Sequence, residues 1–126
     1  MGQFLFASAI LMVAAAAPAA AEEAEIGYPK GSLAYQAITA QDYAKAERQL
    51  RKEVRIPQDD PGRLINHGHV LVKTGRMADA ARAFQKAMEA EEVELILADG
   101  RVMNSREAAE RALMSVSVGG PESRDQ

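Results

Sequence analysis

Between positions 61 and 88 the apolar residues recur every three or four positions, the spacing of helices that each bury one face. Two stripes are present: Leu64, Gly68, Leu71 and Val72, then Met77, Ala80, Ala81, Phe84, Ala87 and Met88. Gly75 separates them and suits a left-handed helix end. Asp60 and Pro61 suit the cap and first position of the first helix. The pattern predicts a helix–turn–helix in which the small residues leave room for Phe84.

A similar pattern occurs earlier in the chain. Residues 41–50 recur in kind as residues 75–84, so that Leu50 corresponds to Phe84. Ser32 is the expected N-cap of this earlier unit, and prolines on either side of the following loop should end its second helix near position 56. The chain therefore contains two related helical units.

The two units share small, apolar and aromatic positions at a fixed period. These are Leu64, Gly68, Leu71, Ala80, Phe84 and Ala87 in the later unit, and Ala34, Asp42, Tyr43, Ala46 and Leu50 in the earlier one. With this period, about 34 residues, the chain resembles the tetratricopeptide repeat family. The resemblance implies about two repeats, at 27–60 and 61–94, whose first helices line a concave groove. It places the partner-binding residues Tyr35, Ile65, Asn66, His69 and Lys73 in that groove.

After the second unit the apolar period changes to two, which indicates a strand. Asp99-Gly100 then stands between two alternating stretches, a strong hairpin signal because both residues of a tight turn need positive φ. The expected cross-strand pairs are Leu97 with Val102 and Ile96 with Met103. We expect a hairpin over 93–103, and the alternative is that the preceding helix continues to position 97.

A final helix is expected over 105–118. Asn104 or Ser105 should cap it, because Glu107 completes an approximate capping box with Asn104. Its apolar stripe consists of Ala108, Ala109, Ala112, Leu113 and Val116. This helix should cover the open end of the repeats. The predicted fold is thus mainly α: repeats, a short hairpin and a C-terminal capping helix within 29–118, followed by a disordered tail at 119–126.

The N-terminal segment, positions 1–21, contains no charge, and an apolar run from Phe4 to Ala17 precedes Pro18 and three alanines. This run is shorter than the ~20 residues that cross a bilayer, and it resembles a secretory signal cleaved after Ala21. The alternative is an uncleaved membrane anchor. We expect a signal peptide at 1–21, a flexible lead at 22–28, and a periplasmic or extracellular protein with no stable membrane insertion after cleavage.

Composition excludes several classes of function. A chain of 126 residues with a net charge of −3 allows one domain and gives no reason to expect nucleic-acid binding. Cysteine is absent, so thiol catalysis and thiolate metal sites are excluded. His67 and His69, two positions apart on a helix, cannot share one metal ion. His69 is expected in the groove, and His67 is expected to pack partly inside.

These observations predict a binding protein and no enzyme, metal or cofactor. The expected function is binding of a protein or peptide partner through the concave groove. The alternative is a structural subunit that buries its groove against its own copy, as a homo-oligomer, or against a larger envelope assembly.

Overall fold

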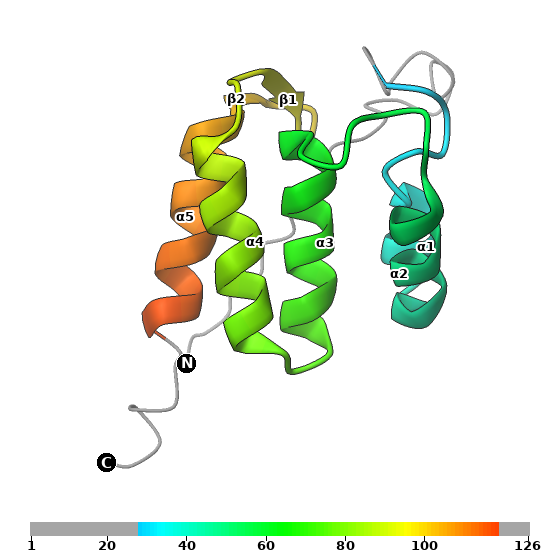
Figure 1. The fold of residues 1–126 in the computed structure, drawn as a ribbon, viewed down its shortest axis with the longest axis horizontal. Coiled ribbons are helices and arrows are strands. Elements are labelled where there is room, and N and C mark those ends of the chain that lie inside the picture. The colour runs from blue at the N-terminus through cyan, green and yellow to red at the C-terminus, as the bar shows by residue number, and fades with distance from the viewer. Residues whose placement is uncertain (1–27, 119–126) are drawn as a thin grey trace.

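The computed structural model describes residues 28–118, which form a mainly helical chain with one short hairpin (Figure 1). The elements are α1 (Tyr35–Thr39), α2 (Tyr43–Lys52), α3 (Pro61–Lys73), α4 (Met77–Glu89), β1 (Glu94–Ile96), β2 (Val102–Asn104) and α5 (Ser105–Val118). The predicted mainly α class, hairpin and final helix are confirmed. The predicted signal peptide, most of the lead and the tail lie outside the described residues. No helix of the described part is long and apolar enough to cross a membrane.

Helices α3 and α4, the second helix pair, pack closely because α3 has a glycine where α4 has a large ring. A Cβ at Gly68 would lie only 2.8 Å from Cδ1 and Cζ of Phe84, whose side chain is fully buried. The close approach expected from Gly68 is therefore confirmed. The predicted cap of α3 is also confirmed: Asp60 Oδ2 accepts a hydrogen bond of 2.9 Å from the backbone N–H of Arg63, and Pro61 is the first helical residue.

The turns inside the two helix pairs have the same backbone hydrogen bonds, 34 positions apart in the chain, as from Ala40 to Thr74. The matching donor-to-acceptor pairs are Ala40 to Gln36 (2.9 Å) and Thr74 to Val70 (3.0 Å), Gln41 to Ile38 and Gly75 to Val72 (both 3.0 Å), and Asp42 to Ala37 (2.9 Å) and Arg76 to Leu71 (2.8 Å). Gly75 has φ 81° and its counterpart Gln41 has φ 63°. The two turns thus share one left-handed geometry, although only one has glycine at that position.

Helices α1 and α2, the first helix pair, begin differently from the prediction. Ser32 does not cap α1; the N-cap position is Ala34, which has φ 59° and gives no side-chain hydrogen bond. Because a left-handed alanine precedes Tyr35, α1 is only five residues long. Its buried residues and those of α2 form a small core with Val70 of α3, separate from the main core.

The hairpin is present, but its predicted register is wrong by one residue. Leu95 pairs with Met103 and Ile96 with Val102, and both Leu95 and Met103 point into the core. The backbone N–H of Leu97 donates to the carbonyl of Arg101, so the loop holds three residues, with left-handed Gly100 (φ 89°) as its last. Asp-Gly therefore ends a three-residue loop here and does not form a two-residue turn.

Helix α5 packs along α4 on the side away from α3, and α1 and α2 lie on the other side of α3 (Figure 1). Asn104 caps α5 through its Oδ1, which accepts hydrogen bonds from Arg106 (2.8 Å) and Glu107 (3.3 Å). Ser105 is buried and its Oγ accepts a 3.0 Å bond from Val93. The main core joins α3, α4, α5 and the hairpin.

Candidate functional site

The structure buries three of the five predicted groove residues. Ile65 and Asn66 are fully buried and His69 is only 9% exposed, whereas Lys73 is exposed and Tyr35 is partly buried. The structure therefore buries Ile65, Asn66 and His69, which were expected from the sequence to face a groove. These three side chains are buried because α3 is the central helix, and neighbouring segments cover the side of α3 on which they lie (Figure 1). Asn66 Nδ2 donates a 2.9 Å hydrogen bond to the carbonyl of Leu33, which holds the segment before α1 on α3.

His67 is partly buried, as expected from the sequence, whereas His69 is buried and does not face an open groove. The ring of His69 packs edge-on against Phe84, with 5.3 Å between ring centroids. Burial, with a smaller contribution from the nearby charge of Lys73, lowers the pKa of His69 to about 4, so this imidazole is neutral at pH 7. His67 is the more exposed of the two and faces the opposite side of α3.

That opposite side of α3 is hollowed. At about 100° per residue, positions 64, 67 and 71 fall roughly opposite positions 65, 69 and 73 on a helix. Two adjoining cavities of about 270 and 300 Å³ lie there and share Leu64, His67 and Lys86. Together they form what we call the cationic cleft, lined by Glu47, Leu50, Arg51, Gln58, Asp59, Arg63, Leu64, His67, Leu71, Arg76, Asp79, Arg82, Ala83 and Lys86. Helices α2, α3 and α4 all contribute to it.

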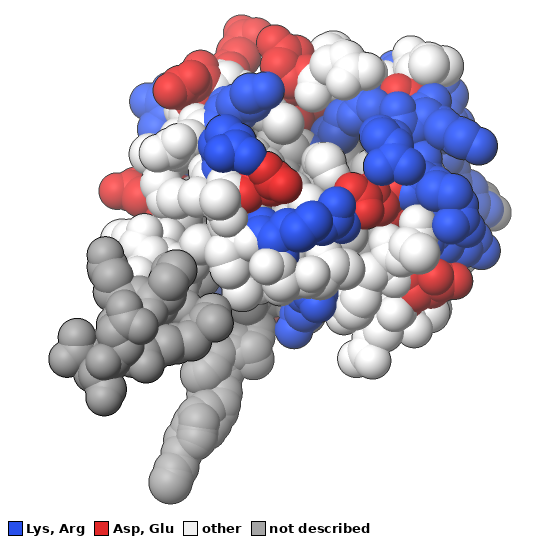
Figure 2. Space-filling model, turned by 60° about the horizontal axis from the view of Figure 1, so that its bottom comes forward, with Lys and Arg blue, Asp and Glu red and all other residues white. Residues whose placement is uncertain are grey.

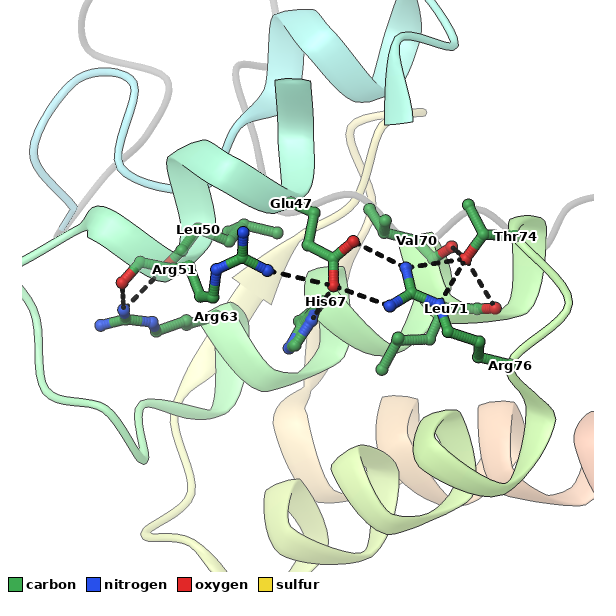
Figure 3. Close-up of polar contacts among 9 residues, drawn as sticks. All are labelled: Glu47, Leu50, Arg51, Arg63, His67, Val70, Leu71, Thr74 and Arg76. Atoms are coloured by element: carbon green, nitrogen blue, oxygen red, sulfur yellow. Dashed lines mark hydrogen bonds and ion pairs between the residues drawn. The ribbon is translucent and has the colours of Figure 1, made fainter. Parts of the chain in front are cut away.

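One carboxylate in the cleft lies close to two arginines and a histidine (Figure 3). Glu47 Oε1 and Oε2 lie 2.6 and 3.0 Å from the two terminal nitrogens of Arg76, a bidentate pair. Arg51 Nη1 lies 3.5 Å from Oε2, and His67 Nε2 lies at the same distance, too long for a good hydrogen bond. Hydrogen bonding to Arg76 is the main reason why the pKa of Glu47 is lowered from its usual range.

Arg63 also belongs to the cleft wall, but its guanidinium is committed to the fold. It is only 5% exposed, and Nη2 donates to the carbonyl of Leu50 at 2.6 Å while Nη1 donates to Ile56 at 3.1 Å. These carbonyls belong to the end of α2 and the loop after it, where helical partners are missing. Arg63 therefore ties the first helix pair to α3 and is not available to a ligand.

The remaining cations of the cleft are at its rim. Arg82 is exposed and pairs with Asp79, and Lys86 has no ion-pair partner within residues 28–118. Lys45, Arg48 and Lys52 are also exposed on α2, but they do not line the cleft. Figure 2 shows Lys and Arg gathered on the side of this face where α2 lies, with few acidic groups among them. The face is thus cationic in a chain whose net charge is −3.

Sequence reasoning overlooked this cleft because it concentrated on one side of α3. The available signals were four Lys or Arg against one Glu in the ten residues of α2, and a histidine at position 67 where the repeat family usually has leucine. Neither signal shows that Glu47 and Arg76, 29 positions apart, meet. That contact depends on how α2 packs on α3.

Among residues 28–118 no group of three or more His, Asp or Glu side chains is arranged to hold a metal ion. No family model, curated protein or solved structure matches this chain.

Proposed function

We propose that this protein is a helical interaction module, similar to the tetratricopeptide repeat family, that binds a protein or peptide partner and catalyses no reaction. The observation that carries the proposal is the cationic cleft: side chains from α2, α3 and α4 surround two adjoining cavities that are open to solvent. Concave sites between helices are common positions for ligands. The binding surface proposed is therefore this cleft, in place of the groove around Asn66.

The recurrence of the turn hydrogen bonds in both helix pairs, one repeat period apart, supports the repeat assignment. So does the fit of Phe84 beside Gly68, because helical repeats need small residues where their helices approach closely. The proposal includes export, which rests on the uncharged, alanine-rich residues 1–21. An exported chain without cysteine depends on packing and capping for its stability, and the hairpin and α5 enlarge the core of the second pair.

Site-specific photo-crosslinking in cells of the native organism tests the proposed binding surface. A photo-reactive residue replaces Arg82 at the cleft rim, Arg111 on α5 as a matched exposed arginine, or Lys73 on the predicted groove side. We expect a discrete crosslinked partner from position 82 and none from position 111. A partner captured from position 73 alone would return the site to the groove, and the absence of any specific product would contradict the proposed function.

Self-association is a second candidate, favoured by the distribution of charge. Glu89 at the end of α4, Glu91 in the loop after it and Glu94 at the start of β1 are exposed. The lining of the cleft, by contrast, has more Lys and Arg than Asp and Glu. A cationic face on one copy and an acidic end on the next would give a head-to-tail contact. Sedimentation at increasing concentration distinguishes the two functions: an oligomer would support the structural role, and a monomer at high concentration would contradict it.

A further inference from the structure

We propose that the cationic cleft binds a carboxylate-rich peptide segment of another protein, and that Glu47 occupies part of this site as an internal competitor. The inference rests on the proposed function and specifies the chemistry of the partner. It concerns the face of α3 opposite the predicted groove, where His67 and Leu64 lie.

The lining of the cleft carries an excess of positive charge. Five Lys or Arg and three Asp or Glu line the two cavities, which leaves two positive charges in excess. Arg63 is committed to backbone carbonyls, but Arg82 and Lys86 extend from α4 at the rim, and Arg51 extends from α2. Arg82 and Arg51 side chains are 65% and 64% exposed, so an incoming anion can reach them.

The contacts of Glu47 show that this cleft can hold a carboxylate. Its carboxylate, only 16% exposed, already receives a bidentate contact from Arg76 and a longer contact from Arg51. The side chains of this cleft therefore converge well enough to hold a carboxylate, and the planar guanidinium is suited to that task. Glu47, Asp59 and Asp79 together offset three of the five Lys and Arg charges in the lining, so the cleft keeps positive charge for an incoming carboxylate.

The floor of the cleft is aliphatic. Leu50, Leu64, Leu71 and Ala83 contribute to its lining. A segment that alternates carboxylates with aliphatic side chains matches both the rim and the floor. A nucleic acid fits less well, because Glu47, Asp59 and Asp79 interrupt the cationic surface that a phosphate backbone would follow.

The probe is a short fluorescein-labelled peptide of glutamates interrupted by leucines, and binding to the full chain is followed by fluorescence anisotropy. We expect binding that weakens as salt is added, because exposed charges are screened. The same peptide with glutamine in place of every glutamate should bind at least about tenfold more weakly. Equal binding of the glutamine peptide, or tighter binding of a labelled thymidine oligonucleotide, would overturn the proposal.

Charge reversal locates the site. Arg82→Glu with Lys86→Glu should weaken glutamate-peptide binding at least about tenfold, whereas Arg101→Glu with Arg111→Glu, the same change of charge elsewhere, should change it less than about twofold. Equal losses in both double variants would show unspecific attraction and contradict a defined site. If peptide binding breaks up an oligomer of the protein, the natural occupant is a second copy, which also overturns the proposal.

Glu47→Gln provides a test that loss of folding cannot imitate. Removing the internal carboxylate frees Arg76 and Arg51, so the glutamate peptide should bind severalfold more tightly. Unchanged or weaker binding in a variant whose circular dichroism is that of the native protein would contradict the competitor role. A crosslinked partner at position 82 without any glutamate-peptide binding would refute the acidic chemistry while leaving the proposed function intact.

Discussion

The two helix pairs have the same turn, but they differ in the length of their helices and in the residues that pack between them. In the second pair α3 and α4 each have 13 residues, Gly75 supplies the left-handed turn, and Phe84 fills the space beside Gly68. In the first pair α1 has five residues, Gln41 is held left-handed, and Leu50 stands where Phe84 does. Two helix pairs of one chain can therefore share the backbone hydrogen bonds of the turn while differing in packing.

The largest expected effect is the removal of the ring at the centre of the second pair. Phe84→Ala should lower the free energy of unfolding by about 3–5 kcal/mol, because a fully buried ring leaves a cavity. Leu50→Ala, its counterpart, should cost about 2 kcal/mol, since its smaller core can collapse more readily. Urea unfolding followed by circular dichroism measures both, as the chain has no tryptophan. Equal costs would remove the packing difference between the pairs.

As the pH falls, the second helix pair should lose stability before the Glu47–Arg76 contact between the two pairs is lost. The folded-state pKa of His69, about 4, lies below the unfolded value of ~6.5. Stability from neutral His69 is therefore complete above pH ~6.5 and falls by up to roughly 3 kcal/mol towards pH 4. Below the ordinary glutamate range, about 4.3, the contribution of Glu47 is lost as well, because its pKa is also lowered. His69→Phe should remove the first phase of a pH–stability curve, and His67→Gln should keep it.

The dependence of the first pair on the second can be tested at Arg63. Arg63→Met keeps much of the side-chain volume but leaves the carbonyls of Leu50 and Ile56 without their donors, which should cost about 2–3 kcal/mol. Hydrogen exchange should increase in α2 more than in α4. Arg82→Met, an exposed control, should change stability by less than about 0.5 kcal/mol. Uniform exchange across both pairs would show that Arg63 does not couple them.

The smallest effects concern the two turns. Gln41→Gly should stabilise the protein by up to about 1 kcal/mol, because glycine adopts φ 63° without steric cost. Gly75→Ala should have the opposite sign and a similar size, since φ there is 81° and an added Cβ would meet no other atom closely. Thermal unfolding of the two variants gives the signs directly. Two changes of the same sign would mean that the turns are not equivalent.

Periodicity and cap residues predicted α3, α4, α5, the Asp60 cap and the place of Phe84, because these depend on neighbours within a few residues. The predicted cap of α5 was Asn104 or Ser105, and the structure shows Asn104. The predictions for the first pair were wrong at both ends, since Ser32 does not cap α1 and α2 ends at Lys52 and not near position 56.

The predicted hairpin was correct in existence and wrong in register, since Asp-Gly is compatible with loops of two or three residues. The burial of Asn66 could not be predicted, because it depends on a contact with Leu33, which lies far away in the chain. The Glu47–Arg76 contact could not be predicted from local patterns either, because its two residues are 29 positions apart.

The proposed binding face of this protein lies between α2 and α4. Titration of the isotopically labelled chain with the glutamate–leucine peptide, followed by amide chemical shifts, tests it most directly. We predict that the largest shifts fall at His67, Arg76, Arg82 and Lys86, around the cationic cleft. Largest shifts at Tyr35, His69 and Lys73, with the cleft residues unperturbed, would instead place the binding face on the opposite side of α3.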